Sequence, residues 1–465
     1  MKRIRSVLCV ISALLIMVCS IPFNTTKVKA ADYWPEGPAV QSQAAIVMEA
    51  STGTILYEKN IHDHHYPASI TKIMTTLLAL ENGNLSDTVT FSHDAVYNTE
   101  GSSIARDVGE QMTLEQCLYA VMLNSANECA YAVAEHIGGT MPSFVDMMNK
   151  KATELGCKDT HFNNPNGLQD TNHYTSAYDM ALIAKAAYQN ETFRLITDTQ
   201  TYTIPPTNKH AVQTFLQNHN EMIYPMKSRK YLYQYCVGGK TGYTIAANST
   251  LVTYAQKDGM TLICVIMNVE SPGQWTDTRS LFDYCFDNFQ LVNVASNEKR
   301  LSNGQINTGD LNTNKSYVQI SQDGTVVIPK TASFTDTVPK VDNTSANGSV
   351  LGTINYMYAN HAVGSANIIT TKPKVNKFNF SNGGTESASS TESTSIKNKK
   401  PPMYINFRII LYVLLGLAIL GAFYALFHFK LKNIIFKRNH MSFEKKNKNP
   451  FKTIRQSKRF RKRRK

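Results

Sequence analysis

A serine and a lysine lie three residues apart at the start of an apolar stretch, in the run PASITK at residues 67–72. Residues three apart share one face of a helix, so the Ser69 hydroxyl and the Lys72 amine can meet. A serine attacks poorly until a base takes its proton, and a lysine becomes that base when burial or a second cation lowers its pKa. The apolar residues around Lys72 favour such burial, so the pair predicts nucleophilic catalysis.

The order of three motifs makes this prediction specific, because the first two motifs also occur elsewhere in the chain. The serine–lysine spacing recurs at 296–299 and 442–445, and Ser-Ala-Asn recurs at 345–347 and 365–367. Only the pair at 69 and 72 is followed by the other two motifs in order. Ser125-Ala-Asn127 comes next, between two helical patterns, and Lys-Thr-Gly at 240–242 follows at the start of a predicted strand.

The ordered motifs resemble the active-serine signature of penicillin-binding proteins and serine β-lactamases. Within that group the chain is similar to the serine-type D-alanyl-D-alanine carboxypeptidases, the low-molecular-mass penicillin-binding proteins. The similarity extends over roughly residues 39–289. Its blocks are PASITKIMT at 67–75, NNPNGL at 163–168, YTSAYDMA at 174–181 and GGKTGYT at 238–244.

The resemblance implies a role for each residue of the first two motifs. Ser69 would attack the carbonyl between the last two D-alanines of a peptidoglycan stem peptide, and β-lactam antibiotics would acylate the same oxygen. Lys72 would be the general base, and Ser125 would pass a proton to the departing amine. Asn127 would bond the substrate backbone and help to hold Lys72. No metal and no cofactor is implied.

The third motif would bind the substrate. Lys240 would add positive potential near the substrate carboxylate and help to keep the first lysine neutral. Thr241 and Gly242 would line an edge strand to which the peptide adds, with the glycine permitting close approach of the backbone. The amides of Ser69 and Tyr243 would form the oxyanion hole.

Arg279 is a further candidate for the carboxylate, and a surface ion pair is its alternative role. Histidines at 62, 64 and 65 precede the nucleophile, but their irregular spacing is typical of solvated loop residues rather than of a metal site. His173 and Asp170 imitate a Ser-His-Asp triad, yet a lysine-based site leaves them no necessary role.

Three other functions stay open at this stage. A β-lactamase of class A would need an acid on a loop after the second motif, and residues 160–167 contain none. A non-catalytic sensor would need a cytoplasmic signalling domain, and the basic tail offers no room for one. Endopeptidase action on cross-links is compatible with the same motifs.

The order of patterns predicts an α+β fold over residues 39–290: a β-lactamase/transpeptidase-like domain with one antiparallel sheet covered by helices. A hairpin is predicted at 44–59 and strands at 240–244, 249–256 and 260–269. Helices are predicted at 69–80, 114–123, 128–136, 141–155, 176–188 and 276–289. Short alternating segments then predict a small β-rich domain over 292–375.

Both ends of the chain carry topological signals. Residues 1–30 predict a signal peptide, with basic residues before an apolar run and Val-Lys-Ala at its end. Residues 376–405 are rich in Ser, Asn and Lys and predict a flexible stalk. Residues 409–429 contain no charged residue and predict a transmembrane helix. The basic residues 430–465 then predict a cytoplasmic tail, with the catalytic domain outside the cell membrane.

The charge distribution supports this topology and argues against nucleic acid as a partner. The chain has 465 residues and a formal charge of +13, but +15 belongs to the tail and +5 to the first thirty residues. The residues between therefore carry −7, which is unlike a nucleic-acid-binding face. Six cysteines follow the signal peptide without metal-site spacing, so both disulfides and buried thiols are possible.

Overall fold

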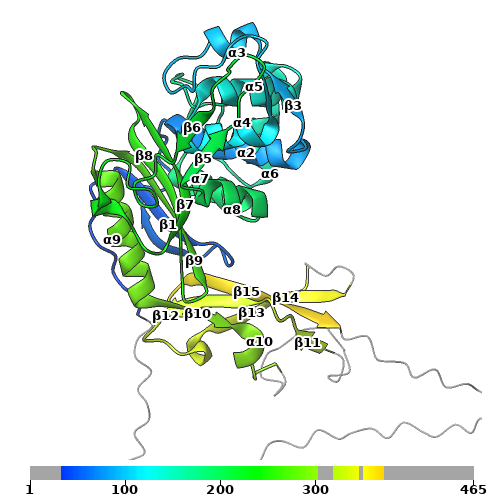
Figure 1. Cartoon of the computed structure of the whole chain (residues 1–465). Helices are drawn as coiled ribbons and strands as arrows, with labels where there is room; N and C mark the ends of the chain where they lie inside the picture. Colours follow the sequence, from blue (N-terminus) through cyan, green and yellow to red (C-terminus); the bar gives the residue numbers. More distant parts are fainter. Residues whose placement is uncertain (1–32, 302–317, 345–348, 371–465) are drawn as a thin grey trace, which may run out of the picture. The chain divides into compact units, whose positions relative to one another are not determined.

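The computed structural model describes residues 33–301, 318–344 and 349–370 (Figure 1). Its main sheet is antiparallel, with strand order β2-β1-β9-β8-β7. The five strands are β1 (Ala44–Glu49), β2 (Ile55–Lys59), β7 (Cys236–Thr244), β8 (Asn248–Lys257) and β9 (Met260–Val269). The predicted hairpin and the three predicted later strands are therefore confirmed, and β7 lies at one edge of the sheet.

Helices cover both faces of this sheet (Figure 1). Alternate residues of β1 divide between two cores: Ile46 packs in the cluster of the helical side, whereas Val47 packs in the cluster that contains residues of α9. This burial on both faces explains why β1 is apolar from Ala44 to Met48. The helices of the described residues here are α2 (Lys72–Asn82), α4 (Leu114–Leu123), α5 (Asn127–Gly138), α6 (Met141–Glu154), α7 (Ala177–Tyr188), α8 (Glu191–Asp198) and α9 (Gly273–Asn288).

Short elements connect the helices, and the sequence patterns did not predict most of them. They are the 3₁₀ turns η1 (Ala68–Thr71) and η2 (Arg229–Tyr231), the helix α3 (His93–Tyr97), the pair β3 (Thr88–Thr90) and β4 (Gln111–Thr113), and the pair β5 (Thr201–Ile204) and β6 (Thr214–Gln217). The start of α4 is fixed by a capping box, in which Thr113 and Gln116 satisfy each other's backbone N–H groups.

A second antiparallel sheet follows α9, and β10 begins at the residue after the helix ends. Its strand order is β10-β12-β15-β14-β13, with β11 paired to β15. Val327 packs in the same cluster as residues of α9, and Trp34 stacks on His361 with ring centroids 3.9 Å apart. The elements are β10 (Phe289–Asn293), α10 (Val294–Asn297), β11 (Val318–Ile320), β12 (Thr325–Pro329), η4 (Phe334–Asp336), β13 (Val338–Asp342), β14 (Val350–Tyr358) and β15 (His361–Thr370).

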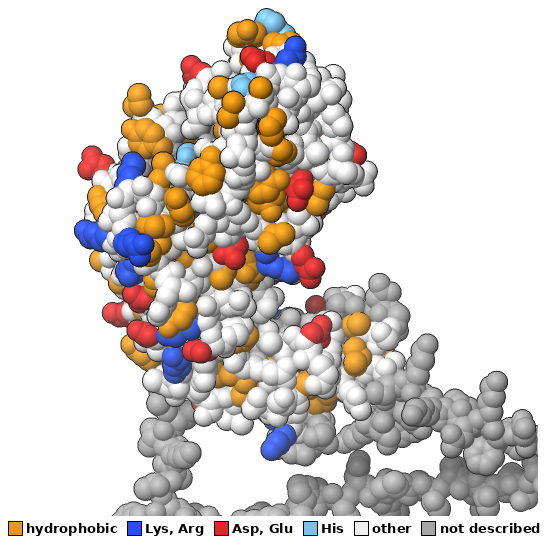
Figure 2. Space-filling model, in the orientation of Figure 1, with side chains coloured by type: hydrophobic (Ala, Val, Ile, Leu, Met, Phe, Trp, Pro, Cys, Tyr) orange, Lys and Arg blue, Asp and Glu red, His pale blue; other side chains and the backbone are white. Residues whose placement is uncertain are grey.

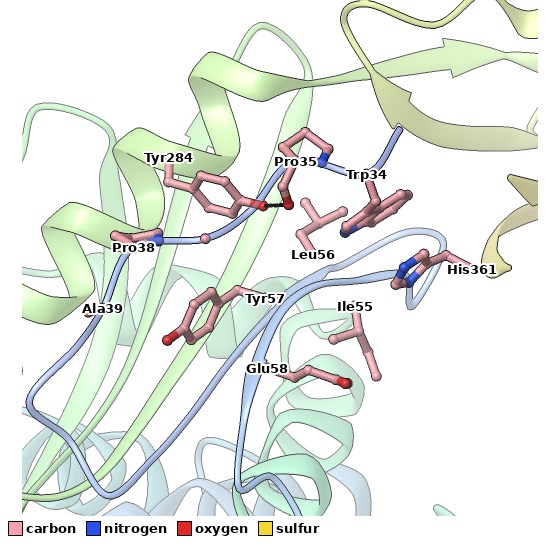
Figure 3. Close-up of a pocket in the computed structure, with 11 residues that line it drawn as sticks. Trp34, Pro35, Pro38, Ala39, Ile55, Leu56, Tyr57, Glu58, Tyr284 and His361 are labelled. Carbon is pink, nitrogen blue, oxygen red and sulfur yellow. Dashed lines mark hydrogen bonds between the residues drawn. The ribbon is translucent and has the colours of Figure 1, made fainter. Parts of the chain in front are cut away.

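A cavity of about 460 Å³ lies beside the extended segment that precedes β1 (Figure 3). Tyr284 of α9 closes one side by donating a hydrogen bond of 2.7 Å to the carbonyl of Pro35. The ring of Tyr57 lies so close to Gly37 that a side chain there would overlap it. The segment is thus held between α9 and β2.

The predicted signal peptide, stalk, transmembrane segment and tail lie outside the described residues. Within the described part, no helix combines the length and the apolar character that crossing a bilayer requires. All six cysteines of the described residues are free thiols, so the disulfide alternative does not hold there. On the face shown in Figure 2, acidic and basic side chains are interspersed.

Candidate active site

Ser69 lies in η1, immediately before α2, so the predicted helix begins three residues later than expected. The turn is held from both sides. The Thr250 hydroxyl donates to the Pro67 carbonyl at 2.8 Å, and Gly167 lies directly against the Ala68 carbonyl, where any Cβ would overlap it. Gly167 also has φ +83°, which favours glycine. These contacts fix the backbone that carries the nucleophile.

The Lys72 amine is fully buried and lies 3.0 Å from the Ser69 hydroxyl. It also lies 2.7 Å from Oδ1 of Asn127 and 2.5 Å from the carbonyl of Asn166. Burial, followed by the positive charge of Lys240, holds the pKa of Lys72 well below its usual value. A neutral amine can donate its two hydrogens to the two carbonyl oxygens, which leaves its lone pair for the serine proton.

The second motif occupies the connection between α4 and α5. Ser125 adopts φ +60°, is 4% exposed, and lines the cleft together with Ser69. Asn127 opens α5, and its amide nitrogen donates to the Glu100 carbonyl. The neighbouring Glu128 accepts bonds from Ser103 Oγ at 2.7 Å and from the Ile104 amide at 2.6 Å. The asparagine and this glutamate thus tie the loop around residue 102 to the second motif.

The third motif lies on the edge strand β7, opposite the nucleophile. Lys240 is 1% exposed, and burial lowers its pKa to about 7. A Cβ on Gly242 would lie 2.9 Å from the Ser69 amide nitrogen and would also overlap Oγ1 of Thr250. Only glycine therefore lets the strand approach the nucleophile this closely, and it brings Tyr243 and Ser69 to the same part of the cleft.

The cleft between these motifs has a volume of about 360 Å³. Eight of the nine predicted site residues line it or contact its nucleophile–base pair, whereas Arg279 does not line it. The Arg279 guanidinium instead donates to the Leu232 carbonyl at 2.6 Å and lies over the Tyr233 ring. Arg279 lies more than one helical turn beyond the residues of α9 that line the cleft. Its side chain therefore faces the loop that precedes β7.

Polar residues that sequence reasoning missed also line the cleft, among them four with ionisable or amide side chains. They come from the segment before β7 and from the first turn of α9: His219, Glu221, Lys227 and Gln274. None belongs to a motif, and only contacts formed across the fold could have identified them. Burial, followed by the positive charges of Lys240 and Lys227, lowers the pKa of His219 to about 4.

His173 contacts the nucleophile helix rather than forming a triad. Its Nδ1 accepts a hydrogen bond of 2.9 Å from the Asn163 amide, so Nε2 carries the proton and donates to Oγ1 of Thr71 at 2.9 Å. Burial lowers the pKa of His173 to about 3. The neutral histidine therefore supports Thr71, the residue next to Lys72.

Two other groups of histidines and acids are engaged in local contacts. His62 lies 3.0 Å from Asp159, at the surface. Glu110 lies near Asp107 and His210, a grouping that could hold a metal ion. The Glu110 carboxylate, however, already accepts bonds from Arg106 at 2.8 Å and from the Thr207 hydroxyl. With a guanidinium in place, this donor set does not suit a cation.

Comparison with known proteins gives consistent matches. The profile of the Peptidase_S11 family, described as D-alanyl-D-alanine carboxypeptidase, matches residues 30–271. The D-alanyl-D-alanine carboxypeptidase DacF of Bacillus subtilis is 35% identical over 278 residues, which cover 58% of this chain and 69% of that protein.

Solved structures show the same similarity. Penicillin-binding protein 5 of Haemophilus influenzae is 28% identical, with a TM-score of 0.58 over 72% of this chain and 98% of that one. The Streptomyces K15 DD-transpeptidase is 30% identical, with a TM-score of 0.51 over 54% of this chain and 100% of that one. Both matches agree with the α+β arrangement described above.

Proposed function

Because the chain belongs to the Peptidase_S11 family of D-alanyl-D-alanine carboxypeptidases, we propose that Ser69 and Lys72 are its nucleophile and general base. The protein is a serine-type D-alanyl-D-alanine carboxypeptidase of cell-wall biogenesis, with the transpeptidase-like α+β fold of penicillin-binding proteins. Its substrates are peptidoglycan stem peptides, and β-lactams bind it. The observation that carries the residue assignment is the buried Lys72 amine, 3.0 Å from the Ser69 hydroxyl.

Acylation then follows from the contacts of the neutral amine. Lys72 takes the proton of Ser69 as the serine oxygen attacks the carbonyl between the two D-alanines. The amides of Ser69 and Tyr243 receive the negative charge that develops on the carbonyl oxygen. As the C–N bond breaks, Ser125 passes a proton to the departing amine and free D-alanine leaves. Attack by water on the ester then regenerates the serine.

The remaining motif residues would hold the substrate during these steps. The stem peptide would add to the free edge of β7, with Thr241 and Gly242 in contact with its backbone. Asn127 would bond the peptide from the opposite side while keeping Lys72 in place. Lys240 would contribute positive potential for the terminal carboxylate, close to Thr241. Arg279 would act only indirectly, by holding the turn at residues 230–232.

We also propose the topology that the ends of the chain predict. Removal of residues 1–30 would export the body, residues 409–429 would span the membrane once, and the basic residues 430–465 would stay in the cytoplasm. The peptidase domain, 39–290, would be followed by a small β domain, 292–375, and a stalk, 376–405. Labelling of single cysteines introduced on each side of residues 409–429 in intact cells tests this: reaction of a tail cysteine with an impermeant reagent would contradict it.

The assignment of the nucleophile is tested with the full-length chain in mild detergent. D-alanine released from diacetyl-L-Lys-D-Ala-D-Ala is quantified, with Ser69→Ala as the variant and Ser296→Ala, in one of the decoy motifs, as the matched control. We expect activity and penicillin labelling to be lost only in Ser69→Ala. Activity retained in Ser69→Ala, or no release by the unaltered protein, would overturn the proposal.

A further inference from the structure

A carboxylate is buried directly after the second motif. Glu128 lies in the first turn of α5 and is 2% exposed. Its Oε1 accepts hydrogen bonds from Ser103 Oγ at 2.7 Å and from the Ile104 amide at 2.6 Å, whereas Oε2 has no hydrogen-bond partner among the described residues. Two donors directed at one oxygen suit an ionised carboxylate, which only accepts. A buried charge of this kind is rare unless an opposite charge lies near it.

Holding the loop before the second motif would not by itself require a charge at this position. The backbone amide of Asn127 already ties α5 to this loop by donating to the Ser102 carbonyl at 2.8 Å. A glutamine in place of Glu128 could accept the same two bonds through its amide oxygen. The guanidinium on this loop, that of Arg106, pairs with Glu110 instead, at 2.8 Å. The positive charge that Glu128 serves must therefore be sought elsewhere.

Lys72 acquires a positive charge during the proposed reaction. When the lysine takes the Ser69 proton, the O–H bond breaks and an N–H bond forms, so the neutral amine becomes an ammonium. Its three N–H groups then face the Asn127 side-chain oxygen, the Asn166 carbonyl and the Ser69 oxygen, none of which is a carboxylate. Asn127 is the first residue of α5, and the positive end of a helix dipole disfavours a cation. A buried ammonium at this place requires negative charge nearby.

Glu128 is the acid whose charge acts on this lysine. Burial and then Lys240 lower the pKa of Lys72, and Glu128 opposes them. The other titratable or charged groups around the two side chains are Lys240 on β7, Cys129 on α5, Cys117 on α4, Arg106 before β4 and His173 before α7. The two cysteines are free thiols, and burial raises the pKa of Cys129 well above its usual value. The histidine is neutral, so this group of neighbours supplies no other negative charge.

We propose that Glu128 is a positioning residue of the reaction: its carboxylate compensates the charge of the Lys72 ammonium, and its hydrogen bonds hold the loop at 100–104 against the second motif. This rests on the proposed roles of Ser69 and Lys72 and adds to them. Lys240 favours the neutral amine before the reaction, whereas Glu128 stabilises the ammonium as the proton is transferred. The two opposite charges together set the basicity of Lys72.

The test measures kcat/KM against pH for D-alanine release from diacetyl-L-Lys-D-Ala-D-Ala by the full-length protein in mild detergent. Glu128→Gln keeps an acceptor for the loop but removes the negative charge, so the pKa of Lys72 should fall. The acid limb of the profile should therefore move to lower pH by about one pH unit. Above the limb, kcat/KM should fall about 3–10-fold, because the ammonium loses its compensating charge. A limb that stays in place or moves to higher pH would overturn the proposal.

Two control variants separate the charge from the loop contacts and from the general field of the domain. Ser103→Ala removes one of the two hydrogen bonds to Oε1 and leaves the charge in place. Asp94→Asn removes an acid of α3 whose side chain is 56% exposed. Both controls should keep the acid limb at the pH of the unaltered protein. The same shift in either control would refute a specific effect of the buried carboxylate.

A measurement without turnover separates this inference from the proposed roles on which it rests. The protein is labelled with ¹³C at Cε of lysine and titrated by NMR, and the resonance that is missing from Lys72→Met identifies Lys72. Glu128→Gln should lower the pKa measured in this way by about one pH unit. An unchanged pKa would refute the inference even if Ser69→Ala abolishes activity. Activity retained in Ser69→Ala would instead overturn the proposed nucleophile, whatever the pKa of Lys72.

Discussion

Replacement of His173 by glutamine should reduce the loss of unfolding free energy that this protein shows when the pH falls from 7 to 5. His173 is 1% exposed and uses both ring nitrogens, one as acceptor from the Asn163 amide and one as donor to Thr71. Protonation of the acceptor nitrogen would set two donors against each other in a buried site. Burial acts in the same direction and lowers the pKa of His173 from 6.5 to about 3.

The sign and size of the effect follow from this shift. Between pH 6.5 and pH 3 the unfolded chain binds a proton at this position and the folded protein does not, so stability falls as the pH falls. Each pH unit in this window removes about 1.4 kcal/mol of unfolding free energy. From pH 7 to pH 5, His173 alone should therefore destabilise the folded protein by about 2 kcal/mol.

Urea unfolding of the full-length protein and of His173→Gln at pH 7 and pH 5 measures this contribution. The variant can be less stable at both pH values, because its contacts change, but it should lose about 2 kcal/mol less between them. Comparing the two differences removes the contributions of His219 and the other titrating groups. Identical losses in the two proteins would refute the assignment of a neutral His173.

Three further outcomes are expected. Gly242→Ala should lower the rate of penicillin acylation at least ~100-fold, because its Cβ would lie 2.9 Å from the amide of the nucleophile; acylation at the unaltered rate would contradict the described geometry. Lys240→Gln should raise the pKa of Lys72 and so move the acid limb of the kcat/KM profile to higher pH; a limb that stays in place would contradict this. Arg106→Met should cost about 3 kcal/mol in urea unfolding, because it leaves the Glu110 carboxylate buried without its guanidinium; a loss below ~1 kcal/mol would contradict it.

The long, regular elements of the fold could be predicted from the sequence. The apolar runs at 114–123 and 260–269 gave the bounds of α4 and β9 because nearly every residue in them is buried. The pair β5 and β6 escaped prediction, since four-residue strands with exposed positions leave little periodicity. The start of β7 was also missed, because Gly238 and Gly239 interrupt the strand pattern.

The site was predictable where chemistry requires fixed spacing and unpredictable where only the tertiary fold brings groups together. Ser69 and Lys72 lie three residues apart, so local geometry already joins them. Glu221 carries no motif, and its place in the cleft depends on how the segment before β7 returns to the sheet. For Arg279 the sequence predicted the helix that carries it, α9, but not the direction in which the side chain points.

The direct passage from α9 into β10 limits how this enzyme can be divided for study. The helix ends at Asn288 and the strand begins at Phe289, so no linker separates the two sheets. Val327 and Phe289 share a hydrophobic cluster with Leu281 of α9. A fragment cut after residue 290 would expose this surface to water and invite aggregation. A soluble fragment for crystallisation should therefore extend through β15, to residue 370 at least.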